Sequence, residues 1–129
     1  MTELTIGERN ELAAMLSARK QTMRDEIRTG LAGLQGETHE DLLSGTSDAA
    51  DQSLAHLITD VAYAEVARDA AELQDILAAE SRIVAGNYGQ CIDCDEPIPY
   101  ARLNAYPTAK RCLRCQQVRE ATRAPTARR

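Results

Sequence analysis

The stretch Cys91-Ile-Asp-Cys94, followed after seventeen residues by Cys112-Leu-Arg-Cys115, decides how this chain folds. It contains all four cysteines of the protein. Two thiolates separated by two residues can bind one ion from a single tight turn, and a second such turn completes a closed four-sulfur site. The spacing therefore predicts one structural zinc ion. Because all four ligands are thiolates, no position stays open for a reactive water, so we expect no catalysis by this zinc.

Disulfides and a redox CxxC pair are the two alternatives to a metal site. A redox CxxC occurs singly beside a βαβ pattern, and disulfides suit a secreted chain. The sequence shows neither context, since it lacks a signal-peptide pattern and has no apolar run near the ~18 residues that span a bilayer. We therefore expect a cytoplasmic protein with reduced thiols and no membrane association.

The composition favours helices over a large mixed core. The chain has 129 residues, with four Tyr and neither Phe nor Trp. Leu, Ala, Ile and Val suit helix-on-helix packing, whereas a large globular core draws on bigger side chains. One compact domain, or a small module with an extended element, is expected.

Charge divides the chain unevenly. Residues 1–100 carry 7 Lys/Arg against 19 Asp/Glu, and residues 101–129 carry 8 against one. The acidic part is not expected to lie along nucleic acid, which repels it. The basic end is suited to phosphates or to an acidic protein face, and a solvated charged tail is the alternative for its last residues.

Two long amphipathic helices are predicted before the cysteines. Thr5 and Glu8 have the spacing of a capping box at the start of the first helix. Its apolar stripe consists of Leu12, Leu16, Met23, Ile27, Leu31 and Leu34. Gly30, Gly33 and Gly36 weaken the end of this helix by up to ~1 kcal/mol each, so we expect bending or fraying there.

The second helix is expected to begin near Ser47 or Asp48, after the polar break at residues 44–47. Its stripe consists of Leu54, Leu57, Ile58, Val61, Val66, Leu73, Ile76, Leu77, Ile83 and Val84. Residues 1–86 then form a mainly α, antiparallel helical hairpin, close to a coiled coil, with its tip near residues 44–53.

A small cysteine module is expected over residues 87–121. Gly86 and Asn87 favour the backbone that ends a helix. Pro97 and Pro99 keep Asp95 to Tyr100 non-helical, and a short hairpin is expected there. One helical turn at residues 101–105 and a C-terminal helix after Cys112 complete the module, and residues 122–129 are expected to form a disordered basic tail.

The residues around the cysteines form a longer pattern. It runs Asn87-Tyr-Gly-Gln-Cys-Ile-Asp-Cys, then Arg102-Leu103, Ala105, Pro107-Thr-Ala109 and Cys112-Leu-Arg-Cys115. This pattern resembles the signature of the DksA/TraR zinc-finger family, with Tyr-Gly-Gln where the family has Phe-Gly-Tyr before the first cysteine. The hairpin that precedes it is also a family feature, so the resemblance covers nearly the whole chain. We expect the family's usual extra N-terminal segment to be absent.

The resemblance implies a non-enzymatic transcription regulator. In DksA-like proteins the hairpin enters the secondary channel of RNA polymerase, and two tip aspartates in the pattern Asp-x-x-Asp-x-Ala act near the polymerase active site. Here Asp48, Asp51 and Ser53 match that pattern, with Ser53 in place of alanine. A purely structural interpretation is that Asp48 caps the second helix and Asp51 lies in its first turn, where the helix dipole favours carboxylates.

The family's best-studied members hold the nucleotide ppGpp with basic side chains on the second helix and after the last cysteine. Arg68 matches one of these positions, while Asp75 and Gln116 occupy two others. A carboxylate repels phosphate. The resemblance therefore implies a weak dependence on ppGpp, with Arg68 as a remnant of the site.

Two other interpretations stay open. The chain could be a zinc-finger module that binds nucleic acid or another protein, since CxxC pairs seventeen residues apart also occur in GATA-type fingers. It could also be a divergent DksA-like scaffold without activity on polymerase. Our first interpretation is a monomer that binds RNA polymerase without sequence-specific DNA contacts. No nucleophile–base pair or phosphate-binding glycine loop indicates an enzyme.

Overall fold

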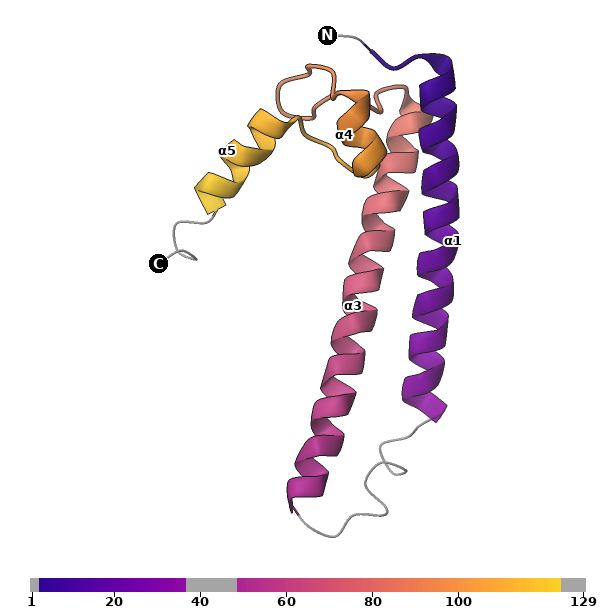
Figure 1. Cartoon of the computed structure of the whole chain (residues 1–129), viewed down its shortest axis with the longest axis vertical. Coiled ribbons are helices and arrows are strands. Elements are labelled where there is room, and N and C mark those ends of the chain that lie inside the picture. Colours follow the sequence, from indigo (N-terminus) through magenta and orange to yellow (C-terminus); the bar gives the residue numbers. More distant parts are fainter. Residues whose placement is uncertain (1–2, 37–48, 124–129) are drawn as a thin grey trace. The chain divides into compact units, whose positions relative to one another are not determined.

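The protein is mainly α-helical in a computed structural model that describes residues 3–36 and 49–123 (Figure 1). The described residues form four helices in order along the chain: α1 (Ile6–Gly36), α3 (Ala49–Ala85), α4 (Tyr100–Ala105) and α5 (Leu113–Arg123). The described residues contain no strand, and a single antiparallel bridge joins Gln90 to Pro97. None of the described helices has an apolar stretch long enough to cross a membrane.

The predicted capping box starts the first helix. The backbone N–H of Glu8 donates to Thr5 Oγ1 at 3.0 Å, and the backbone N–H of Thr5 donates to Glu8 Oε1 at 3.1 Å. Two N–H groups without a partner inside the helix are thereby satisfied. From this start α1 continues through all three of its late glycines to Gly36, so the expected fraying does not end the helix early.

The second long helix ends where the sequence predicted. The backbone N–H groups of Gly86 and Asn87 donate to the carbonyl of Arg82, at 2.9 and 3.0 Å. Gly86 has a φ of 89°, a conformation that side chains with a Cβ rarely adopt. The chain thus leaves α3 through a glycine turn and enters the cysteine module directly.

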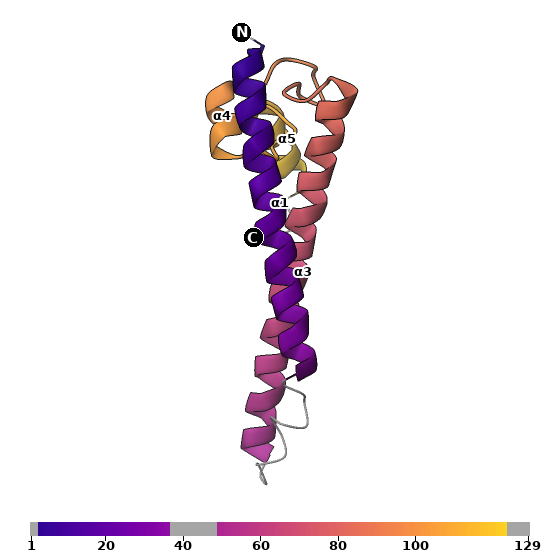
Figure 2. The same cartoon turned by 90° about the vertical axis from the view of Figure 1, so that its right-hand side faces the viewer.

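Contacts divide the chain into two units. One, which we call the cysteine unit, comprises Met1–Ala18 and Asp75–Arg129; the other, the hairpin unit, comprises Arg19–Gln74. In each unit a segment of α1 runs alongside an antiparallel segment of α3, as two views of the ribbon show (Figures 1 and 2). The expected domain boundaries at residues 86 and 121 stay a prediction, because the two units are defined by contacts in space and not by patterns in the sequence.

The cysteine unit has a core drawn from three segments. Its largest fully buried side chains are Leu12, Leu16, Ile76, Cys91, Ile98 and Leu103. The first two come from α1, the third from α3 and the others from the cysteine module. A hydrogen bond of 2.7 Å from the Tyr100 hydroxyl to Glu11 Oε1 also joins α4 to α1.

In the hairpin unit the two helices meet along a narrow line. Arg19 and Glu72 form a two-point ion pair, with Nε–Oε2 at 2.6 Å and Nη2–Oε1 at 3.1 Å. A Cβ added at Gly30 would lie 2.7 Å from Val66 Cγ2, so the helices approach closely there.

The apolar stripe predicted for the second helix is only partly buried. Several of its members are exposed by 41–87%, namely Leu54, Leu57, Ile58, Val61, Leu77 and Val84. Helical periodicity identifies the apolar side of a helix but not how much of that side a partner covers. In the hairpin unit a single facing helix covers only a strip, and Ala55 occupies the buried position there.

Candidate metal centre

The first pair of cysteines sits on a tight backbone hairpin. The N–H of Ile98 donates to the carbonyl of Gly89 at 2.7 Å, and the N–H of Cys91 donates to the carbonyl of Glu96 at 2.9 Å. The turn closes with Asp95 at a φ of 64°, a left-handed conformation that Asp and Asn tolerate better than most residues. This turn brings Cys91 and Cys94 to the same side. The short hairpin expected over Asp95 to Tyr100 lies earlier in the chain, between Gly89 and Ile98, and Tyr100 already belongs to α4.

The second pair sits at the start of α5. Cys112 immediately precedes the helix, and Cys115 lies in its first turn. The N–H of Gln116 donates to the carbonyl of Cys112 at 2.9 Å, which fixes that turn. A bond of 2.9 Å from the N–H of Ile92 to the carbonyl of Lys110 then joins the two cysteine-bearing turns.

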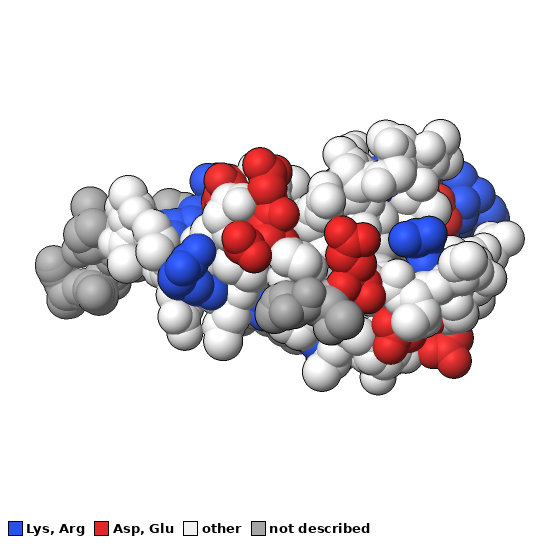
Figure 3. All heavy atoms as spheres, turned by 90° about the horizontal axis from the view of Figure 1, so that it is seen from above, with Lys and Arg blue, Asp and Glu red and all other residues white. Residues whose placement is uncertain are grey.

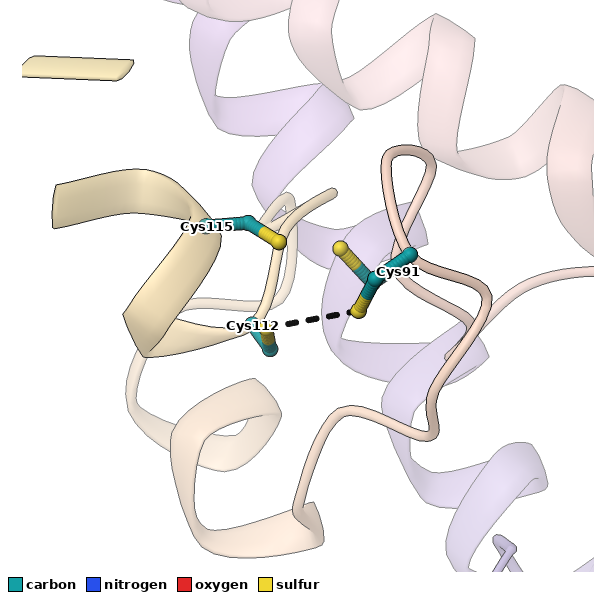
Figure 4. Close-up of side chains that lie close together, drawn as sticks. Cys91, Cys112 and Cys115 are labelled. Carbon is teal, nitrogen blue, oxygen red and sulfur yellow. Dashed lines mark hydrogen bonds between the residues drawn. The ribbon is translucent and has the colours of Figure 1, made fainter. Parts of the chain in front are cut away.

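The structure brings all four cysteines together. Their Sγ atoms lie within 4.8 Å of one another, and Cys94 and Cys112 are 3.8 Å apart. Figure 4 shows Cys91, Cys112 and Cys115 turned toward a common point. A tetrahedral site with Zn–S bonds of about 2.3 Å has sulfur–sulfur edges of about 3.8 Å. The four sulfur atoms are therefore close enough to bind one zinc ion, and no disulfide joins them.

The surroundings of the thiols favour a bound cation. Burial acts to raise the pKa of Cys91, but hydrogen bonds from the backbone at Cys112, Cys94 and Asp93 outweigh it and lower the pKa to about 6. Burial and the neighbouring thiols raise the pKa of Cys115 to about 12. Four thiolates at this separation repel one another, and a divalent cation among them would remove that repulsion.

A small apolar core supports the cysteines. Tyr88 is buried, and its hydroxyl donates to the carbonyl of Pro107 at 2.8 Å. Burial raises the pKa of Tyr88 to about 12, although the positive charge of Arg82 acts against this rise. Gly89, with a φ of 90°, lets Leu4 approach within 3.0 Å of the position that a Cβ would take. Tyr88 thus belongs to this core, whereas Tyr106 is 52% exposed.

One charged residue near the cysteines is buried. The exposed fraction of Arg111 is 8%. Its Nε donates to Asp93 Oδ2 at 2.8 Å. The signal in the sequence is an acid inside the first CxxC and a base directly before the second.

The remaining predicted site residues lie away from the cysteines in sequence. Asp48 lies outside the described residues, and Asp51 belongs to the first turn of α3, its side chain not being described. Ser53 and Arg68 are exposed residues of α3 in the hairpin unit. Their roles stay predictions.

The surface seen in Figure 3 is mixed in charge. Lys and Arg side chains are interspersed with Asp and Glu among the described residues of that face, rather than forming a continuous basic surface. A protein that tracks a nucleic-acid backbone usually presents a basic patch or groove. This face therefore offers no support for the nucleic-acid-binding alternative.

Comparison with known proteins agrees with this geometry. The prokaryotic dksA/traR C4-type zinc finger family matches residues 86–121, which include all four cysteines. The RNA polymerase-binding transcription factor DksA of Caulobacter vibrioides is 34% identical over 107 residues, covering 81% of this chain and 70% of that protein. The chain belongs to the DksA/TraR family.

Two further similar proteins show how much of the chain the likeness covers. The structure of transcription factor DksA2 from Pseudomonas aeruginosa matches with a TM-score of 0.74 at 25% identity, covering 92% of this chain and 87% of that one. An uncharacterised 8.2 kDa protein of Escherichia phage P2 is 61% identical over 31 residues, which are 24% of this chain and 42% of that protein. The DksA/TraR likeness thus includes the helices as well as the cysteine module.

Proposed function

We propose that this protein is a DksA-like regulator that binds bacterial RNA polymerase through the secondary channel and modulates transcription initiation. The observation that carries the proposal is the 34% identity to an RNA polymerase-binding transcription factor, which extends over 81% of the chain. The match in fold to DksA2 supports it, because the helices as well as the zinc finger are shared.

The proposal assigns one structural zinc ion to Cys91, Cys94, Cys112 and Cys115. Four thiolates leave no open coordination position, so the ion would hold the two turns together without taking part in a reaction. We propose that the regulator is not an enzyme, and that it acts in the cytoplasm as a monomer without sequence-specific DNA contacts or membrane association.

The proposal places the regulatory contact at the hairpin tip. Asp48, Asp51 and Ser53 follow the family's tip pattern, and α3 begins at Ala49, between the two aspartates. Carboxylates at the start of a helix are stabilised by the helix dipole and stay available to a partner or to Mg²⁺. Ser53 in place of alanine is the departure that could weaken the contact.

We further propose that ppGpp has little effect on this regulator. Arg68 keeps one basic position, but Asp75 places an exposed carboxylate at another. Gln116 occupies the third and donates to Glu120 Oε2 at 2.8 Å, so that position carries no positive charge. Phosphate would be repelled by the carboxylates and attracted by Arg68 alone.

The test compares the wild type with Asp48→Asn/Asp51→Asn in binding to polymerase core enzyme and in an initiation assay in vitro, with and without ppGpp. Asn caps helices about as well as Asp, so the variant loses the charges and keeps the helix start. A control, Asp60→Asn/Glu65→Gln, removes two exposed charges elsewhere on α3.

We expect the wild type and both variants to bind the enzyme, and the tip variant alone to lose its effect on initiation. An equal response with and without ppGpp supports the role given to Asp75 and Gln116. Failure of the wild type to bind polymerase rejects the proposed function, and DNA binding with a steep salt dependence would favour the nucleic-acid alternative.

A further inference from the structure

An ion pair between a buried arginine and a half-exposed aspartate links the two cysteine-bearing turns. Asp93 lies between Cys91 and Cys94 in the first turn, and Arg111 directly precedes Cys112 in the second. Their contact, from Arg111 Nε to Asp93 Oδ2, is 2.8 Å long. The two side chains are unequally buried, since that of Arg111 is 10% exposed and that of Asp93 is 45% exposed. The arginine is therefore the partner that depends on the pair.

The pair is part of a longer connection. Arg102, from α4, donates through its Nε to the backbone carbonyl of Arg111 at 3.0 Å. The backbone bond from Ile92 to Lys110 runs beside the pair and joins the same two turns. The residues next to Cys91, Cys94 and Cys112 are thus held in place by hydrogen bonds and an ion pair within the chain, as well as by any shared metal.

We propose that Arg111 and Asp93 are positioning residues for the metal, which fix the two CxxC turns at the separation that the ion requires and slow its release. The inference rests on the zinc site proposed above, and goes beyond it by assigning a role to two residues that are not ligands. Outer residues of this kind orient ligands, and their loss typically costs 10–100-fold in metal affinity.

The physical reason is the cost of an unpaired buried charge. Without Asp93, the Arg111 guanidinium would have to move toward water, and Cys112 is the next residue in the chain. A buried charge that loses its partner is more disruptive than the loss of the whole pair, because the remaining charge is not compensated. Without Arg111, the half-exposed Asp93 can be solvated where it stands. The two single substitutions should therefore differ.

A chelator can reach the site from solvent. Cys112 lines a groove of about 730 Å³ between α4 and the start of α5, together with Tyr106 and Leu113. Cys115 lines a second hollow of about 400 Å³. Zinc release can thus be measured on the folded protein, without prior unfolding of the helices.

The experiment measures zinc content first, then the rate of zinc transfer to an excess of a chelating dye. The variants are Asp93→Asn, Arg111→Met and the double substitution. Asp95→Asn is the matched control, because Asp95 is an exposed carboxylate beside Cys94 and Asn also tolerates its left-handed backbone. The absorption spectrum with Co²⁺ in place of zinc reports on the geometry of the four sulfurs, and circular dichroism checks that the helices remain.

We expect Asp93→Asn to release zinc about 10-fold faster than the wild type, and Asp95→Asn to stay within about twofold. Arg111→Met should have a smaller effect, and the double variant should resemble Arg111→Met rather than the product of the two single effects. The Co²⁺ spectrum should change in Asp93→Asn and not in the control.

Equal release rates for Asp93→Asn and Asp95→Asn, with one zinc in the wild type, would overturn this inference and leave the proposed zinc site intact. A wild type that holds no zinc would reject the site itself, and this inference with it. If Asp93→Asn does not fold, Arg111→Lys against Lys110→Arg gives the same test with the charge kept. Lysine lacks the planar guanidinium, so faster release in Arg111→Lys alone is the supporting result.

Discussion

The cysteine unit and the hairpin unit contain segments of the same two helices, yet they are stabilised differently. In the cysteine unit, α1 and α3 contribute fully buried side chains such as Leu12 and Ile76. In the hairpin unit, Met23 and Ala55 are the only buried residues among those described between Arg19 and Gln74. The difference lies in what accompanies the helices. The cysteine module adds Ile98 and Leu103 to the core of its unit.

The comparison shows that an apolar stripe and a core are separate properties. Leu54, Leu57, Ile58 and Val61 follow helical spacing, but each stays about half exposed. Two helices pack along one line, and a third element is needed to cover the flanks of that line. The hairpin unit instead relies on close approach at Gly30 and on an exposed ion pair between Arg19 and Glu72, which is worth at most about 1 kcal/mol.

The largest expected effect that separates the two units is that of zinc removal. Chelation should abolish hydrogen-exchange protection in residues 88–112 and leave it largely unchanged in the helices between Arg19 and Gln74. Binding of a structural zinc is worth roughly 10–16 kcal/mol in zinc-finger peptides, far more than any single contact in the module. Amide exchange followed by mass spectrometry measures both regions at once. As a control, zinc but not Mg²⁺ should restore the protection. Equal loss of protection in both regions would contradict the idea that the two units are stabilised differently.

A matched pair of leucine substitutions tests the comparison through an effect of intermediate size. Leu12→Ala in the cysteine unit removes a fully buried side chain, and Leu57→Ala in the hairpin unit removes one that is 57% exposed. The first should lower the free energy of unfolding by about 2–5 kcal/mol and the second by less than about 1 kcal/mol. Urea denaturation followed by circular dichroism measures both. Similar losses would show that Leu57 is covered in solution.

The sequence predicts local geometry better than burial. The cysteine cluster follows from two CxxC turns, and the helix ends follow from Thr5, Glu8 and Gly86, because each of these signals acts within a few residues. The burial of Arg111 could not be predicted in the same way. It depends on Asp93, eighteen residues away, and on how the two turns face each other.

The proposed role of the tip residues is harder still to predict from sequence. Asp48 and Asp51 have a local structural explanation at the start of a helix, so their spacing alone does not distinguish capping from polymerase contact. Only the resemblance to the DksA/TraR family gives them a functional meaning, and the polymerase assay decides it. The fold is therefore more predictable than the site at the tip, because the fold rests on many residues and the tip on three.

The smallest expected effect comes from two glycines of α1 that have the same helical setting and different neighbours. An alanine Cβ at Gly33 would meet nothing within 4 Å, whereas one at Gly30 would lie 2.7 Å from Val66 Cγ2. Alanine is favoured over glycine in a helix by about 1 kcal/mol, so Gly33→Ala should stabilise the protein by up to about that amount. Valine is stiff at χ1 and cannot move its methyl group aside cheaply, so Gly30→Ala should lose this gain and destabilise by about 1 kcal/mol. Urea denaturation of the two variants gives the difference directly. Equal stabilisation by both would mean that the helices of the hairpin unit do not approach closely at Gly30.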